Sequence, residues 1–196
     1  MDFFMMYGTA WKKERTESLV TQALEKGFVA IDTANQAKHY SESLVGEALK
    51  KYFNQGNDRK NFFIQTKFTP IGGQDERLPY DKDDKISVQV AQSVESSLKH
   101  LGLDYLDSLL LHGPYHYPRL GEEDWEAWGA LEKVLQEGKT RRIGISNVNQ
   151  LQLSELLEKA SHKPTVVQNR CFAQTGWDFH VRKLCQSNGM RYQGFS

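Results

Sequence analysis

Four residues suited to acid–base chemistry stand at or near the ends of short apolar runs. Asp32 follows "VAI", Lys67 follows "FIQT", His112 follows "LLL", and Tyr40 comes eight residues after Asp32. A carboxylate beside an ammonium group, with an imidazole and a phenol close by, can transfer a proton to or from an oxygen atom. Since burying charged groups without partners is costly, their shared position after apolar runs calls for a chemical explanation.

The elements that would position these residues alternate along the chain. Short runs rich in β-branched and aromatic residues predict strands at 3–7, 28–32, 62–67, 106–112, 142–146, 165–169 and 191–195. Segments of helical period between them predict helices at 17–26, 42–53, 86–101, 123–137, 150–160 and 178–188. We expect Thr16 to cap the first helix, and Gly27, Gly138 and Gly189 to follow helix ends.

This alternation is typical of an α/β fold with a parallel sheet covered by helices. Two architectures fit the pattern, an open doubly wound sheet and a (β/α)8 barrel. The longest irregular stretch is 69–84, and a loop of that length in a compact domain is often functional.

Polar residues at the strand ends favour the barrel. Parallel strands bring their carboxyl ends to one face, where the catalytic groups of barrels come from several strands. Asp32 and Lys67 would then lie on neighbouring strands, close enough to pair. Other strands end in Ser146–Asn147 and in Gln168–Asn169. Taken singly, Asp32, Lys67 and His112 could be a helix cap, a solvated strand end and a turn residue, but together they indicate a site.

Seven motifs in register resemble the aldo-keto reductases: "YGTAW", "GFVAIDTA", "VGEAL", "FFIQTKF", "LGLDYLDSLLLHGP", "GKTRRIGISN" and "PTVVQNR". The resemblance covers nearly the whole chain. It implies a (β/α)8 TIM-barrel type of fold and hydride transfer between NADP(H) and an aldehyde, ketone or alcohol. It also implies that residues 1–196 form a single, incomplete barrel domain. About seven of the eight strands would be present, with the last strand and the C-terminal helices missing.

The resemblance also assigns the site. It implies Asp32, Tyr40, Lys67 and His112 as the catalytic residues, with Tyr40 as general acid. The pKa of Tyr40 would be lowered by Lys67, which Asp32 would hold in place, while His112 would donate a hydrogen bond to the substrate oxygen. The implied cofactor-binding residues are Gly8, Thr9, Ala10, Asp32, Ser146, Asn147, Gln168 and Phe195, and Trp11 is the implied substrate-pocket residue.

The loop after Asp32 departs from the usual family pattern. The family tyrosine normally comes five residues after the aspartate, where this chain has Ala37. Tyr40 is our choice for the acid, and His39 is the alternative. A phenol beside an ammonium group can be tuned as an acid, whereas an imidazole there would lose its proton more readily.

Composition excludes several other classes of function. The 25 basic and 25 acidic residues balance, so nothing indicates nucleic acid or an anionic membrane as a partner. No apolar run is long enough to cross a bilayer, and "MDFFMMYG" lacks the basic start of a signal peptide, so we expect a cytoplasmic protein. Cys171 and Cys185 are expected to be reduced core thiols. The HxxxH of His112 and His116 lies in a Gly-Pro loop and is not expected to bind metal.

Three interpretations of an incomplete barrel remain open at this stage: a fragment or truncated isoform with weak or absent activity, a chain that closes the barrel by pairing with another chain, and a non-catalytic relative. Without an eighth strand, the chain could be a catalytically weak or inactive relative that binds a nucleotide or acts as a regulatory partner protein. The first and seventh strands would also be open edges, through which we expect self-association to be possible.

Overall fold

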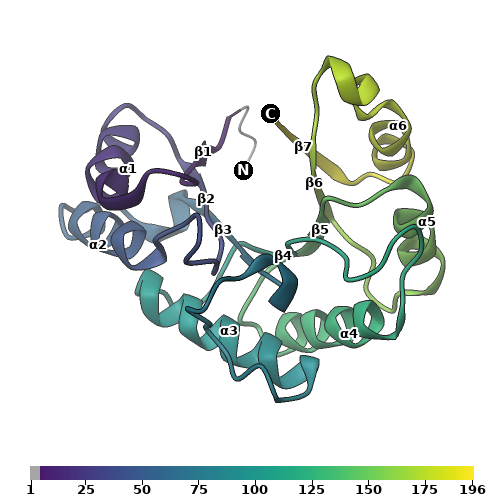
Figure 1. Ribbon diagram of the computed structural model, residues 1–196. Helices are drawn as coiled ribbons and strands as arrows, with labels where there is room; N and C mark the ends of the chain where they lie inside the picture. Colours follow the sequence, from purple (N-terminus) through teal and green to yellow (C-terminus); the bar gives the residue numbers. More distant parts are fainter. Residues whose placement is uncertain (1–4) are drawn as a thin grey trace.

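A computed structural model describes residues 5–196, which contain one sheet of seven parallel strands in sequential order. The strands are β1 (Tyr7–Gly8), β2 (Ala30–Asp32), β3 (Phe63–Phe68), β4 (Ser108–Leu111), β5 (Ile143–Ser146), β6 (Val166–Arg170) and β7 (Arg191–Phe195). The α-helices are α1 (Thr16–Glu25), α2 (Glu42–Phe53), α3 (Ile86–Leu101), α4 (Glu122–Gln136), α5 (Gln150–Lys159) and α6 (Phe179–Ser187). In Figure 1 the strands form an arc and the helices lie outside it.

The curvature of this sheet decides between the two predicted architectures. Gln65 on β3 and Gln193 on β7 exchange side-chain hydrogen bonds of 2.8 and 3.1 Å. In a flat sheet, two strands four positions apart would lie about 19 Å from each other. The side chains can therefore meet only across the inside of a barrel. The sequential strand order also differs from that of a doubly wound sheet. The (β/α)8-type prediction is confirmed, with seven strands present among the described residues.

Most predicted elements agree with the structure to within a few residues. The predicted strand 3–7 is observed as Tyr7–Gly8, and its first two residues lie outside the described part of the chain. Gly27, Gly138 and Gly189 follow helices with φ of 91°, 75° and 66°, the left-handed conformation that glycine favours. None of the helices in residues 5–196 combines the length and apolar character that a membrane span needs.

The prediction that Thr16 caps the first helix is wrong. Thr16 is the first residue of α1, and its hydroxyl donates a hydrogen bond back to the Lys13 carbonyl at 2.6 Å. The preceding turn is a short 3-10 helix, Lys13–Arg15, whose backbone leads directly into α1. The cap position is therefore Arg15, which makes no capping side-chain hydrogen bond.

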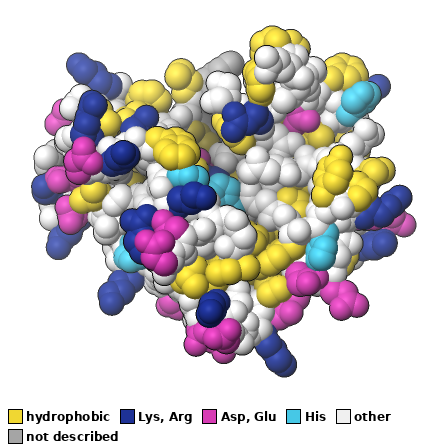
Figure 2. Space-filling model, viewed as in Figure 1, with side chains coloured by type: hydrophobic (Ala, Val, Ile, Leu, Met, Phe, Trp, Pro, Cys, Tyr) yellow, Lys and Arg dark blue, Asp and Glu magenta, His cyan; other side chains and the backbone are white. Residues whose placement is uncertain are grey.

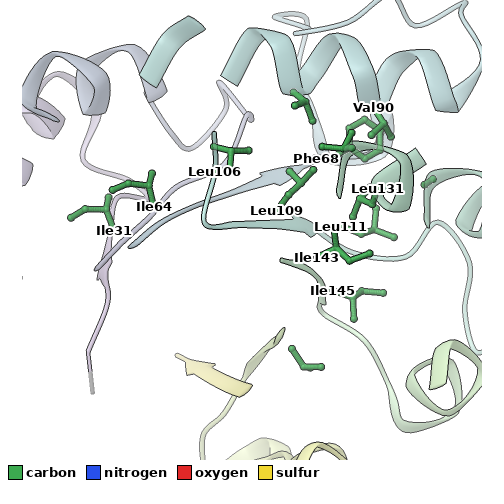
Figure 3. Close-up of a cluster of buried hydrophobic side chains, with 14 of the residues drawn as sticks. Ile31, Ile64, Phe68, Val90, Leu106, Leu109, Leu111, Leu131, Ile143 and Ile145 are labelled. Atoms are coloured by element: carbon green, nitrogen blue, oxygen red, sulfur yellow. The ribbon is translucent and has the colours of Figure 1, made fainter. Parts of the chain in front are cut away.

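The hydrophobic core lies between the outer face of the sheet and the helices. Figure 3 shows Ile64, Leu109 and Ile143 on neighbouring strands, with Phe68 near Val90 of α3 and Leu111 near Leu131 of α4. Each of these side chains is at most 1% exposed. Because the helices attach to the outer face, the inner face is left to the polar side chains at the strand ends.

Glycine at position 46 allows α2 and α3 to pack closely. A Cβ atom at Gly46 would lie 2.0 Å from the backbone oxygen of His100, whereas a Cβ at Gly129 of α4 would meet nothing within 4 Å. We expect Gly46→Ala to destabilise the protein by about 3 kcal/mol, because the backbone of α3 must move. The matched change Gly129→Ala should stabilise it by about 0.5–1 kcal/mol through helix propensity. Urea unfolding of both variants measures the two changes in free energy of unfolding, which should have opposite signs. Equal changes would contradict this account.

The outermost strands β1 and β7 each have one neighbour, and they do not pair with each other within residues 5–196. Strand β1 and the C-terminal end of the chain lie at this opening of the arc (Figure 1). Gly8, Asp32, Gln193 and Phe195 line a pocket of about 420 Å³ there. The barrel interior is therefore reached from its side as well as from its end.

Candidate active site

Asp32 and Lys67 form the ion pair predicted from their strand ends. The register of β2 and β3 sets Asp32 beside Gln65, so Lys67 lies one inward-facing position further along β3. Lys67 Nζ donates to both carboxylate oxygens of Asp32 at 2.8 Å and to the Thr33 carbonyl at 2.7 Å. These acceptors match the three N–H donors of an ammonium group. Each donor of the Lys67 side chain, which is 1% exposed, therefore has a hydrogen-bond partner.

Tyr40 lies against this ion pair. Its backbone N–H, like that of His39, donates to the Gln36 carbonyl, and this turn directs the loop back over the end of the barrel. Lys67 Nζ lies 5.4 Å from the centroid of the Tyr40 ring, and the ring of His112 lies 6.0 Å from it. The structure thus brings Asp32, Tyr40, Lys67 and His112 into one cluster.

His39 has other partners in the same loop. Its Nδ1 is 2.8 Å from Gln36 Oε1, and its ring packs against Trp11 at 3.7 Å between centroids, with the two rings tilted by 40°. Burial, followed by the charge of Lys38, lowers the pKa of His39. Trp11 itself is 67% exposed, and it lines a pocket of about 490 Å³ together with His39 and Tyr40.

The expected lowering of the Tyr40 pKa is wrong for this structure. Burial, followed by the negative charge of Asp32, raises the pKa of the Tyr40 phenol above its usual value. All three Lys67 donors go to Asp32 and to the backbone of Thr33. The ammonium group therefore lies beside the Tyr40 ring with its charge already balanced. Tyr40 is held as a protonated phenol, the form that a proton donor requires.

His112 directly follows β4, and hydrogen bonds hold both its backbone and its side chain. Its backbone N–H donates to the Phe68 carbonyl at 2.8 Å, and Nδ1 lies 2.6 Å from the hydroxyl of Thr69. Burial, followed by the charges of Lys67 and His39, lowers the pKa of His112 to about 3. The imidazole is therefore neutral at physiological pH and carries one N–H group.

A neutral buried histidine makes stability depend on pH. Since the pKa of His112 falls from 6.5 to about 3 on folding, the unfolded chain binds the additional proton between these values. Stability should therefore fall as the pH falls through this window. Between pH 7 and pH 5 we expect the wild type to lose about 2 kcal/mol more than a His112→Gln variant, at about 1.4 kcal/mol per pKa unit. Urea unfolding of both proteins at the two pH values measures the difference, and equal losses would refute it.

Four of the predicted cofactor residues line one pocket. Gly8, Asp32, Gln168 and Phe195 surround the space of about 420 Å³ between β1 and β7. The guanidinium of Arg170 lies 5.2 Å from the centroid of the Phe195 ring. The Gln168 amide donates to Gln193 at 3.1 Å. An aromatic ring, amide groups and a carboxylate therefore line this space together.

The remaining predicted cofactor residues take different places. Ser146 donates its hydroxyl to the Gln168 carbonyl at 2.6 Å, and Asn147, at φ 53°, donates its amide to the His112 carbonyl at 2.8 Å. Asn147 is exposed, so its side chain also borders the open face of the site. Thr9 is fully buried and donates to the Asp32 carbonyl at 3.0 Å, which makes it a structural support, and Ala10 is half-buried beside it.

Sequence reasoning missed three side chains that complete the cluster. Gln65 donates to Asp32 at 2.8 Å and joins it to Gln193 across the barrel, while Thr69 contacts His112. Gln65 and Gln193 each stand two residues before a predicted site residue, so the strand period of two could have identified them. No comparable signal marks Thr69, which lies in a loop.

The open end of the barrel offers room for a substrate beside His112. Thr69, His112, Asn147 and Tyr115 line a pocket of about 320 Å³ there. Figure 2 shows histidine side chains near the centre of this view of the molecule. Within residues 5–196, no group of three or more His, Cys, Asp or Glu side chains is arranged to hold a metal ion.

Fold and site together define a barrel-type parallel sheet with a cluster of ionisable side chains at the carboxyl ends of its strands. The sequence profile of the Aldo/keto reductase family matches residues 4–196. Glyoxal reductase of Bacillus subtilis is 34% identical over 184 residues, which are 93% of this chain and 58% of that protein. Morphine 6-dehydrogenase of Pseudomonas putida is 34% identical over 160 residues, 79% of this chain and 46% of that protein.

Solved structures of aldo-keto reductases superpose on this chain. The aldo-keto reductase MGS-M4, from a deep-sea metagenome library, superposes with a TM-score of 0.80 at 28% identity, covering 99% of this chain and 64% of that one. The aldo-keto reductase AKR2E5 of the silkworm Bombyx mori, complexed with NADPH, gives a TM-score of 0.77 at 25% identity, covering 97% and 58%. The chain belongs to the aldo/keto reductase family. It spans about half to two thirds of the length of these relatives.

Proposed function

We propose that this chain is an NADP(H)-dependent oxidoreductase that reduces an aldehyde or ketone to an alcohol, with Tyr40 as the general acid. The observation that carries the proposal is the packing of the protonated Tyr40 phenol beside His112 and the Asp32–Lys67 ion pair. The nicotinamide assignment is supported by relatives solved with NADPH and NADP and by the pocket at Phe195.

The bound cofactor would supply the hydride for the carbonyl carbon. Gln168, Asn147 and Ser146 have amide and hydroxyl oxygens that would hold its carboxamide, with the Phe195 ring against the nicotinamide. As the hydride reached the carbon, the electron pair of the C=O π bond would pass to the oxygen, which would take the proton of the Tyr40 hydroxyl. His112 would donate a hydrogen bond to the same oxygen as negative charge develops on it. Tyr40 regains its proton from solvent after the alcohol leaves.

An NADPH titration, followed by a turnover assay, tests the proposal. Binding should quench the fluorescence of the four tryptophans in a saturable way, and adding an aldehyde should oxidise NADPH in proportion to the enzyme present. Saturable binding without turnover of aldehydes or ketones would support the alternative of a nucleotide-binding regulatory protein. A folded chain that shows neither would overturn both.

A further inference from the structure

Thr69, in the loop after β3, makes a partly buried hydrogen bond to the proposed catalytic histidine. Its Oγ1 lies 2.6 Å from His112 Nδ1, and Thr69 is 3% exposed. A neutral imidazole has one N–H, so this bond has two possible directions. If the Thr69 hydroxyl donates, the imidazole proton is on Nε2. If Nδ1 donates, Nε2 has only a lone pair.

The need to satisfy a buried hydroxyl selects the first direction. A buried O–H group requires an acceptor for its proton. Across residues 5–196, His112 Nδ1 is the one hydrogen-bond partner found for the Thr69 hydroxyl. Were Nδ1 to donate, the Thr69 proton would have no protein acceptor among the described residues. The hydroxyl therefore donates to Nδ1, and the imidazole proton is on Nε2.

The loop 69–84 fixes Thr69 in this position. The Thr69 carbonyl accepts hydrogen bonds from the Tyr80 hydroxyl at 2.8 Å and from the Gln74 amide at 3.3 Å. Its methyl group packs against Gly73, where an added Cβ would lie 2.8 Å from Thr69 Cγ2. Gln36 donates in turn to the Gly73 carbonyl at 2.6 Å, so the loop is tied to the segment that carries Tyr40.

We infer that Thr69 is a positioning residue that holds neutral His112 in its Nε2–H tautomer. The inference rests on the proposed carbonyl reduction and extends it. With the proton on Nε2, His112 presents a donor to the carbonyl oxygen; with the proton on Nδ1, it would present a lone pair that repels that oxygen. Control of a histidine tautomer by the hydrogen bond on its other nitrogen is a general device of active sites.

Nitrogen NMR of the protein labelled with ¹⁵N-histidine tests the tautomer directly. The chain has six histidines, and a His112→Gln variant identifies the signals of His112. We expect the protonated-nitrogen shift at Nε2 in the wild type and in Thr69→Ser, and a move toward the Nδ1–H form in Thr69→Val. A wild-type spectrum with the proton on Nδ1 would overturn the inference, whatever the variants do.

Kinetics of the same variants test the consequence. Thr69→Val keeps the side-chain shape without the hydroxyl, so we expect kcat/KM for an aldehyde to fall about 100-fold, the lower end of the effect of losing one transition-state hydrogen-bond donor. The affinity for NADPH should stay unchanged, and Thr69→Ser should restore most of the rate. A Thr69→Val variant with wild-type rate and wild-type tautomer would contradict the inference. If neither the wild type nor any variant oxidised NADPH with an aldehyde, the result would count against the proposed function. The wild-type NMR spectrum would still decide the tautomer.

Discussion

Tyr40→Phe is expected to lower the rate of aldehyde reduction by about 10²- to 10⁴-fold, the usual contribution of a positioned general acid. The change removes one hydroxyl and keeps the ring that packs beside Lys67 and His112. Binding of NADPH should persist, because the predicted cofactor pocket is formed by other residues. The measurements are NADPH oxidation with an aldehyde and fluorescence titration with NADPH.

The neighbouring histidine provides a matched control. His39 precedes Tyr40 in the same loop, but its ring is held by Gln36 and Trp11. We expect His39→Gln to retain most of the rate, because the glutamine leaves the Tyr40–Lys67–His112 cluster unchanged. If His39→Gln lost activity while Tyr40→Phe kept it, His39 would be the acid and the assignment of Tyr40 would be wrong.

Lys67→Met should reduce the free energy of unfolding by about 3–5 kcal/mol, the effect of leaving one partner of a buried ion pair without the other. Lys67 is 1% and Asp32 13% exposed at the side chain, so water replaces little of the lost interaction. After the change, the Gln65 amide would be the one side-chain donor left to Asp32 among residues 5–196. Urea unfolding at fixed pH measures the loss.

Two further variants separate the effect of burial from the loss of a lysine. The ion pair Lys51–Glu17 has a Lys51 side chain that is 64% exposed, and Lys51→Met should leave the urea midpoint nearly unchanged because solvent screens that pair. The double variant Asp32→Asn/Lys67→Met should lose less free energy of unfolding than the two single variants lose together, because no charge is left unpaired. Additive losses would show that the two charges do not act as a pair.

Local pattern alone predicted most of the fold and part of the site. Alternation of strand and helix periods placed the seven strands, since each period depends on residues close together in sequence. Sequential parallel strands align their carboxyl ends, so the Asp32–Lys67 pair followed from the strand order. The capping prediction for Thr16 failed because a turn of 3-10 helix precedes α1, and the sequence pattern does not distinguish these two helical starts.

Three features were decided only by tertiary structure. The path of the loop after β2, set by hydrogen bonds to Gln36, brings Tyr40 rather than His39 into the cluster. Burial and Asp32 raise the Tyr40 pKa, which reverses the direction expected from the nearness of Lys67. Thr69 meets His112 although 43 residues separate them. Spacing in the sequence carries the identity of these groups, but their burial and long-range contacts depend on how the barrel curls and where its loops return.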